Sequence, residues 1–265
     1  MNKILIALTT LLFVYTGQAY SQGFCGGKNT CFKDGENVSF YVFYTVAGIW
    51  VHAGTAQFTV KQERLDNKPV WHFDGTGVSL PNYDWIYKVR DRYQSYVDTN
   101  TMQPLKFVRD VDEGKYKKSE LITFNKGNNT ANTKDGKSFK VPACIHDVMS
   151  QVYYARNINF DKYKVNDTIP FDIFLDNEVH RVYIRYLGRE TIKSKYGKFR
   201  CLKIKPLLLT SSMFEGGEKM TVWISDDGNR LPIRIESGIS VGSVKVDMMM
   251  YRNLRYPLTS LISIR

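Results

Sequence analysis

Histidine and cysteine, which often carry catalysis or bind metals, are scarce in this 265-residue chain, with four of each. No C-x-x-C pair occurs, so thiol redox catalysis has little support. Ser150 lies four residues after His146, and this pair keeps an envelope hydrolase as an alternative. Cys144, His146 and Asp147 lie close together but lack a second cluster to complete four zinc ligands. We therefore expect no metal and no other cofactor, and we favour a non-enzymatic protein.

Long apolar runs are missing beyond the N-terminus. No later stretch approaches the ~20 apolar residues of a membrane-spanning helix, so we expect no transmembrane segment in the mature protein. At the N-terminus, Lys3 precedes an apolar run over residues 4–15, and a polar stretch then ends in Ala19-Tyr20-Ser21. This pattern predicts a signal peptide over residues 1–21, cleaved between Ser21 and Gln22. The mature protein should be periplasmic or secreted.

The four cysteines are Cys25, Cys31, Cys144 and Cys201. Cys25 follows Phe24 and not the small residue of a lipoprotein signal, so we expect no lipid anchor. In an exported protein, four cysteines permit three disulfide connectivities. Cys25 and Cys31 flank the flexible GGKNT segment, and we predict a disulfide between them. A Cys144–Cys201 pair is a second prediction, and four free thiols are the alternative.

Acidic residues are outnumbered, at 26 against 37 lysines and arginines, which gives a formal net charge of +11. The basic residues are spread along the chain, and the densest group is Lys115, Lys117 and Lys118, as is typical of solvated strand faces. The net positive charge favours anionic partners such as lipid headgroups, lipopolysaccharide or acidic glycans. Nucleic acid is not an expected partner outside the cytoplasm.

Apolar and polar residues alternate along much of the chain. Val182, Ile184 and Tyr186 form one apolar face, and residues 244–250 repeat the pattern. One apolar face at period two predicts antiparallel strands over a core. Turn signals recur at DNKP, DEGK, NKGNN, KDGK, KYGK and DDGN, as in a meander of hairpins. About a dozen strands are too many for a flat sheet. We therefore predict a mainly β fold with one large curved antiparallel sheet, which forms an open barrel or a sandwich-like structure.

One segment breaks the alternation and predicts a helix near residues 144–157. Its apolar residues recur at three- and four-residue spacing: Ile145, Val148, Met149, Val152 and Tyr153. The helix separates two sets of strands, and no linker rich in proline, glycine or serine flanks it. We therefore predict one β-rich domain over residues 22–265, with the helix packed on or in the sheet. Residues 80–88 should contain a short helical turn.

The adjacent carboxylates of Asp226 and Asp227 suggest either a metal site or a turn. An EF-type calcium loop needs ligands at alternate positions and a closing glutamate, which this stretch lacks. A tight turn instead needs Asp or Asn with a glycine, and Gly228 provides it between TVWIS and LPIRIE. We predict a hairpin, and we expect replacement of both aspartates by asparagine to change function and stability little.

Four blocks, in order, resemble the domain of unknown function 3108 family of exported bacterial β-rich proteins. They are Ser39–Val60 with its G-x5-G step, Ile86–Tyr116, His146–Arg156, and Tyr196–Pro206 continuing through residues 222–237. Together they span nearly the whole mature chain. The resemblance implies a large curved antiparallel sheet around a helix, akin to the open barrels of periplasmic lipoprotein carriers. It implies no established activity and supplies no catalytic residues.

Aromatic residues make up 14% of the chain, and an ordinary packed core accounts for many of them. The alternative is a ligand cavity, whose predicted lining residues are Trp85, Tyr87, Tyr153, Trp223 and Met248. With export and a curved sheet, this predicts a protein that binds or escorts a hydrophobic or lipid-like envelope component, with basic residues drawing anionic headgroups to the rim. The competing hypothesis is a structural module that binds another envelope protein.

Overall fold

The structure is a computed structural model that describes residues 26–46, 49–210, 215–239 and 242–264. The predicted signal peptide and its cleavage position between Ser21 and Gln22 lie outside these ranges. Strands dominate the described residues because apolar side chains at every second position give each strand one face to bury.

The N-terminal half is a meander in which each strand pairs antiparallel with the one before it. Its strands are β1 (Asn37–Val46), β2 (Ile49–Leu65), β3 (Lys68–Ser79), β4 (Val89–Asp98), β5 (Pro104–Glu113), β6 (Tyr116–Asn125), β7 (Thr130–Thr133) and β8 (Ser138–Lys140). Asp66 and Asn67, which join β2 to β3, have φ values of 48° and 63°. Two successive positive φ angles are the backbone of a two-residue hairpin turn, which Asp and Asn tolerate.

The C-terminal half contributes the remaining strands. They are β9 (Ile145–His146), β10 (Thr168–Leu175), β11 (Glu178–Lys193), β12 (Gly197–Pro206), β13 (Leu208–Thr210), β14 (Glu215–Gly217), β15 (Met220–Ser225), β16 (Pro232–Gly238), β17 (Ser243–Arg252) and β18 (Leu261–Ile264). β13 and β14 form a separate two-stranded sheet, and β9 pairs parallel with β10.

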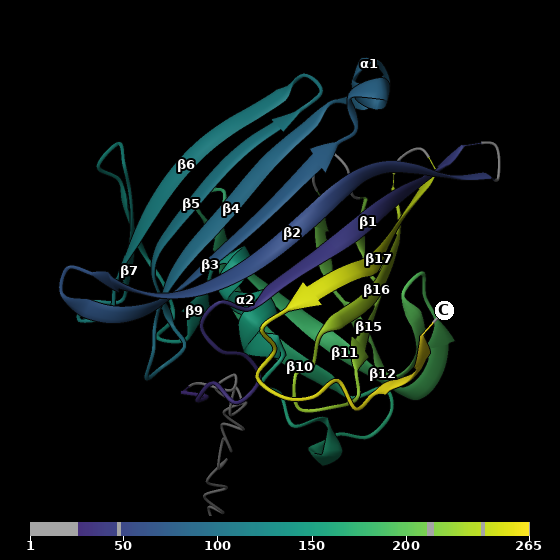
Figure 1. The fold of residues 1–265 in the computed structure, drawn as a ribbon. Coiled ribbons are helices and arrows are strands. Elements are labelled where there is room, and N and C mark those ends of the chain that lie inside the picture. Colours follow the sequence, from purple (N-terminus) through teal and green to yellow (C-terminus); the bar gives the residue numbers. More distant parts are fainter. Residues whose placement is uncertain (1–25, 47–48, 211–214, 240–241, 265) are drawn as a thin grey trace, which may run out of the picture.

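One 16-stranded sheet unites the two halves, because β1 pairs with β17. Its order is β8-β7-β6-β5-β4-β3-β2-β1-β17-β16-β15-β12-β11-β10-β9, with β18 beside β12. The sheet curls without closing, since β8 and β9 are its edges (Figure 1). This confirms the predicted mainly β, open-barrel-like fold. The described residues form 18 strands, of which twelve have six residues or more, and the short ones are too brief to leave a detectable alternation.

The predicted helix is α2 (Val148–Ala155), and it is shorter than expected because Ile145 and His146 pair with β10 as β9. Asp147 caps its N-terminus. The Asp147 carboxylate accepts the backbone N–H of Ser150 at 2.8 Å, and Ser150 Oγ accepts the N–H of Asp147 at 2.9 Å. α2 lies inside the curve of the sheet and contacts β3, β4 and β10 (Figure 1).

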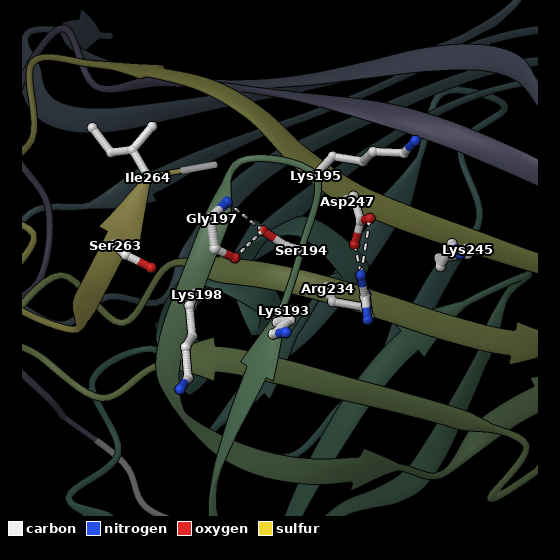
Figure 2. A pocket seen from close by; sticks show the side chains of 10 residues that line it. All are labelled: Lys193, Ser194, Lys195, Gly197, Lys198, Arg234, Lys245, Asp247, Ser263 and Ile264. Atoms are coloured by element: carbon white, nitrogen blue, oxygen red, sulfur yellow. Dashed lines mark hydrogen bonds and ion pairs between the residues drawn. The ribbon is translucent and has the colours of Figure 1, made fainter.

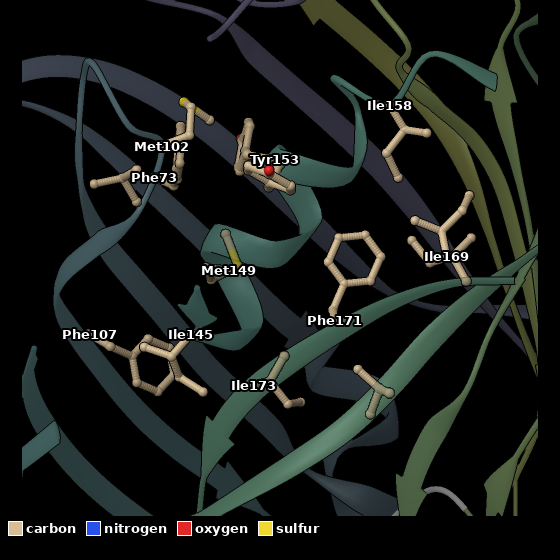
Figure 3. Close-up of a cluster of buried hydrophobic side chains, with 14 of the residues drawn as sticks. Phe73, Met102, Phe107, Ile145, Met149, Tyr153, Ile158, Ile169, Phe171 and Ile173 are labelled. Carbon is tan, nitrogen blue, oxygen red and sulfur yellow. The ribbon is translucent and has the colours of Figure 1, made fainter. Parts of the chain in front are cut away.

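Side chains of α2 fill the space beneath the sheet. Met149 and Tyr153 point from the helix into the main core (Figure 3). Tyr153 stacks on Phe73 with ring centroids 3.8 Å apart. A Cβ added at Gly75 would lie 2.7 Å from the Phe58 ring and 3.0 Å from the Met149 methyl group, so glycine is what allows this close approach. The core between helix and sheet is therefore close-packed.

Arg156, the C-cap residue of α2, ties the helix to distant segments. Its guanidinium donates to the Glu36 carboxylate at 2.6 and 3.0 Å and to the Asn229 carbonyl at 3.2 and 2.8 Å. It also lies over the rings of Phe32 and Tyr153, at 5.5 and 5.3 Å from their centroids. The ion pair is almost fully buried, with side chains 5% and 1% exposed.

The stretch from Asp226 to Asn229 joins β15 to β16, as the hairpin prediction requires. Asp227 Oδ1 accepts the Ser225 hydroxyl and the Asn229 N–H, both at 3.0 Å, and Oδ2 accepts the Ser260 N–H at 3.1 Å. Asp226 forms ion pairs with two arginines. The two carboxylates are thus occupied in holding the turn and the C-terminal segment.

The connection between β3 and β4 contains the expected helical turn. A 3-10 turn, η1 (Pro81–Tyr83), leads into the one-turn helix α1 (Asp84–Tyr87). Across the described ranges, no helix has the length and apolar character needed to cross a membrane.

The cysteines differ from the prediction. Cys31 and Cys201 are free, buried thiols, so neither the Cys25–Cys31 nor the Cys144–Cys201 disulfide is formed. Cys31 points into the core, where its Sγ donates to the Arg156 carbonyl at 3.0 Å. Cys144 is disulfide-bonded, and Cys25 lies outside the described residues. Burial raises the pKa of Cys201 to about 12, which leaves this thiol unreactive.

Candidate functional site

The five residues predicted to line a ligand cavity do not come together. Tyr153 is buried in the main core around α2. Trp223 and Met248 are buried in a second core cluster, built from β1, β12 and β15–β17. Trp85 and Tyr87 lie on α1, where Trp85 is 82% exposed. Three of these side chains therefore pack the interior, and two lie at the surface.

A hollow of about 470 Å³ opens between the β11–β12 hairpin and strands β16 and β17 (Figure 2). Its lining residues are Lys193, Ser194, Lys195, Gly197, Lys198, Arg234, Lys245, Asp247, Ser263 and Ile264. Five of these side chains are cationic and one is anionic, which gives the basic hollow a formal charge of +4. Such a concentration of positive charge attracts anions.

The one carboxylate that lines the basic hollow is already paired. Asp247 Oδ1 accepts Arg234 Nε at 2.6 Å, and Oδ2 accepts Nη2 at 3.0 Å. The two residues face each other across β16 and β17, and Asp247 is 1% exposed. This bidentate, buried pair satisfies both partners. The four lysines therefore have no free carboxylate among the lining residues to neutralise them.

The β11–β12 turn presents three of the lysines. The Ser194 N–H donates to the Gly197 carbonyl at 2.8 Å and closes the hairpin. Lys193 and Lys198 are direct cross-strand partners, and like charges in this register repel each other. A Cβ at Gly197 would lie 2.3 Å from the Ser263 carbonyl, so glycine lets β18 approach and form the second wall. An anion bound between the lysines would relieve their repulsion.

Aromatic rings border the basic hollow on the side of β1 and β2. Lys195 Nζ lies 5.4 Å from the ring centroid of Phe43. Lys245 Nζ lies 5.7 Å from the same ring and 4.3 Å from the ring of Trp50. These cation–π contacts restrain two long side chains. The border combines apolar surface with positive charge, which suits a ligand that carries an anionic group on an apolar body.

A carboxyl pair lies elsewhere, on β4 and β5, where Asp91 is half-buried and Glu113 is buried. Asp91 and Glu113 share a hydrogen bond, and burial followed by this bond raises the pKa of Asp91 to about 7. The Asp91 carboxyl also accepts the Asp112 N–H at 3.2 Å. The pair can therefore hold one shared proton near neutral pH.

The residues considered for a metal or for hydrolysis lie at the start of α2. Burial lowers the pKa of His146 to about 3 and raises that of Asp147 to about 6. Ser150 Oγ donates to the Asp147 carbonyl at 3.1 Å, so its hydroxyl serves the helix cap. Burial also lowers the pKa of Lys126 to about 8. In the part of the chain that the structure describes, no three His, Cys, Asp or Glu side chains are grouped so that they could hold a metal.

Fold and site together define an open, barrel-like β protein with a basic hollow on its surface. The chain belongs to the family described as protein of unknown function DUF3108, which matches residues 38–249. This confirms the resemblance seen in the sequence. No curated protein matches the sequence.

Two solved structures align with the chain. A beta-barrel-like protein of domain of unknown function DUF1849 from Brucella abortus aligns with a TM-score of 0.57 at 7% identity, over 86% of this chain and 100% of that chain. A candidate exported protein with a YmcC-like fold from Bacteroides fragilis aligns with a TM-score of 0.31 at 9% identity, again over 86% and 100%. At this identity, the Brucella structure supports the fold alone.

Proposed function

We propose that this chain is an exported, non-enzymatic protein that binds the anionic headgroup of a lipid-like envelope component at the basic hollow. The observation that carries this proposal is the +4 charge of the hollow, whose one lining carboxylate is already paired with Arg234. A phosphate or carboxylate can contact several lysines at once. Trp50, which is exposed beside Lys245, offers apolar surface to the atoms next to the headgroup.

The packing around α2 supports a surface site over an interior one. An acyl chain in the concavity would have to occupy the space that Phe73, Met149 and Tyr153 fill. The aromatic content of the sequence is therefore used largely for the core. Only the headgroup-binding part of the hypothesis drawn from the sequence is retained here.

Export enters the proposal through the N-terminal sequence. Lys3, the apolar run and the small residues before Gln22 form the signal-peptide pattern. An exported protein meets anionic lipids and lipopolysaccharide, which are the partners that its net positive charge favours.

Calorimetric titration with dihexanoyl phosphatidylglycerol, below its micelle concentration, tests the proposal. In the hollow variant, glutamine replaces the four lysines Lys193, Lys195, Lys198 and Lys245. This variant should bind at least about tenfold more weakly than the wild type. The matched control carries glutamine at four exposed lysines elsewhere, Lys61, Lys68, Lys134 and Lys162.

The control should bind nearly as well as the wild type, because it loses the same net charge but keeps the basic hollow. Dihexanoyl phosphatidylcholine, which has no net charge, should bind weakly to all three proteins. Equal weakening in both variants would reduce the effect to net charge and refute the proposed site. Recovery of a protein partner that competes with the lipid for the hollow would instead favour an interaction module.

A further inference from the structure

Exposed apolar side chains lie at one end of the N-terminal sheet. They come from the start of β2, from the end of β3 with the β3–β4 connection, and from the start of β6. We call this end the apex, and its exposed apolar residues are Ile49, Trp50, Val78, Trp85, Ile86, Tyr87 and Tyr116. Figure 1 shows α1 projecting beyond the strands at this end. An exposed apolar group of this size on neighbouring strand ends marks an interaction surface.

The opposite end of the same strands has a different composition. Its connections are β2–β3, β4–β5 and β6–β7, with turn sequences DN, TNTMQ and KGNN. Met102 is the one large apolar residue of these turns, and it is fully buried. Both ends belong to the same strands and both face solvent. The exposed apolar residues of the apex are therefore not a general property of these hairpins.

Hydrogen bonds hold α1 and the β5–β6 turn of the apex in place. Arg90 Nη2 donates to Asp84 Oδ2 at 2.7 Å, and the Ser79 hydroxyl donates to the same carboxylate. The Gly114 N–H donates to the Lys88 carbonyl at 2.8 Å, which fastens the β5–β6 turn to the end of α1. A fixed apolar surface loses little conformational entropy when it binds.

Trp85 is prepared for an environment without water. Its indole N–H donates to the Asn82 carbonyl at 2.9 Å, within the same turn. Transfer of an indole into an apolar phase is costly when the N–H loses its hydrogen bond. Because this bond is internal, the ring can leave water and keep it. Trp and Tyr side chains with one polar atom are the typical residues of membrane–water interfaces.

Lysines are the most exposed charged groups beside the apolar tips. Lys88 and Lys117 both pair with Asp112, at 2.9 and 3.5 Å, and their side chains are 43% and 72% exposed against 24% for Asp112. Lys115 is exposed in the β5–β6 turn. Apolar tips with a basic margin match the surface of an anionic bilayer, where each lysine adds to binding.

We infer that the apex docks on the surface of an anionic lipid bilayer. Separate convex tips suit a broad, soft surface better than a peptide, which needs a groove or a free strand edge. The tips would enter the headgroup region, and the lysines would contact phosphates. This inference stands on residues other than the four lysines of the basic hollow, so either proposal can fail alone.

Sedimentation with vesicles tests the inference. The protein should sediment with vesicles of phosphatidylcholine mixed with phosphatidylglycerol, and less with pure phosphatidylcholine or in high salt. The apex variant carries Trp85→Ser and Ile86→Ser, and it should bind roughly tenfold more weakly. The control carries Val165→Ser and Ile262→Ser at two exposed apolar positions away from the apex, and it should bind as the wild type does.

Other results would overturn the inference. Absence of sedimentation by the wild type, or equal binding by the apex variant, would exclude a bilayer as the occupant. If the wild type self-associates in ultracentrifugation and the apex variant does not, with vesicle binding unchanged, the apex binds a second copy instead. The apex variant should retain binding of soluble dihexanoyl phosphatidylglycerol, which separates this test from that of the basic hollow. Unchanged thermal melts verify that each variant folds.

Discussion

Replacing Arg156 with methionine should show how far the fold depends on one buried ion pair. The Glu36 side chain is 1% exposed and that of Arg156 is 5% exposed. Methionine keeps an apolar stem against Phe32 and Tyr153 but removes the guanidinium. The Glu36 carboxylate then loses both of its hydrogen bonds from Arg156, and the Asn229 carbonyl loses two.

The expected loss of stability follows from the buried groups that lose their partner. Removing one partner of a buried ion pair costs about 3–5 kcal/mol, because the other charge becomes buried without compensation. The Asn229 carbonyl adds roughly 1 kcal/mol. A loss of ~4–6 kcal/mol is large against the ~5–15 kcal/mol that typically separates folded from unfolded protein. The double variant with Glu36→Gln should lose less than the sum of the single variants, by at least about 2 kcal/mol.

Urea unfolding, followed by tryptophan fluorescence and far-UV circular dichroism, measures these free energies. Arg92→Met is the matched control, because Arg92 also pairs bidentately, with Asp74, but is 54% exposed. It should cost less than about 1 kcal/mol. A loss under ~1 kcal/mol for Arg156→Met, or strict additivity with Glu36→Gln, would refute the reasoning.

Two further predictions concern carboxylates. Asp91 has a pKa of about 7 in the folded protein against an ordinary 3.8, so the folded state binds its proton more tightly and stability falls as pH rises from about 4 to about 7. Asp91→Asn should remove this pH dependence and stabilise the protein by roughly 1–2 kcal/mol above pH ~7, a value reduced because Asp91 is partly exposed. Thermal melts of both proteins at about pH 5 and pH 8 measure this. An equal change in melting temperature between the two pH values for both proteins would contradict the prediction. Asp227→Asn should cost about 1–2 kcal/mol, more than the sequence alone led us to expect, because the Ser260 N–H loses its acceptor. Asp226→Asn should cost under ~1 kcal/mol, because its ion pairs are partly exposed; equal urea midpoints for these two variants would contradict the assignment.

Local patterns were sufficient for the longer strands and for the position of the helix. Val182, Ile184 and Tyr186, chosen for their alternation, are all buried on one face of β11. The start of α2 was placed too early, because Ile145 and His146 extend the helical spacing but pair with β10. That pairing is a contact between separate segments, which a local period does not contain.

Contacts between distant segments explain what the sequence did not reveal. A disulfide between Cys25 and Cys31 was expected from loop length alone, yet Cys31 Sγ reaches the Arg156 carbonyl, 125 residues away. The basic hollow gathers lysines from the β11–β12 turn and from β17, and each reads as a solvated strand position by itself. Its one local sign was KSKYGK, three lysines around a tight turn, which was recognised only as a turn.

The basic hollow and the apex meet at the β1–β2 hairpin. Trp50 belongs to the apex, and Lys245 of the hollow lies 4.3 Å from its ring. The pairing of Tyr44 with Val244 places the start of β17 beside the end of β1, at the same end of the sheet. A bilayer at the apex would therefore bring Lys245 to the level of the headgroups, with the other lysines of the hollow behind it. The apolar tips would set the depth of docking, and the lysines would select anionic headgroups. A close-packed interior is compatible with both roles, since neither needs a cavity.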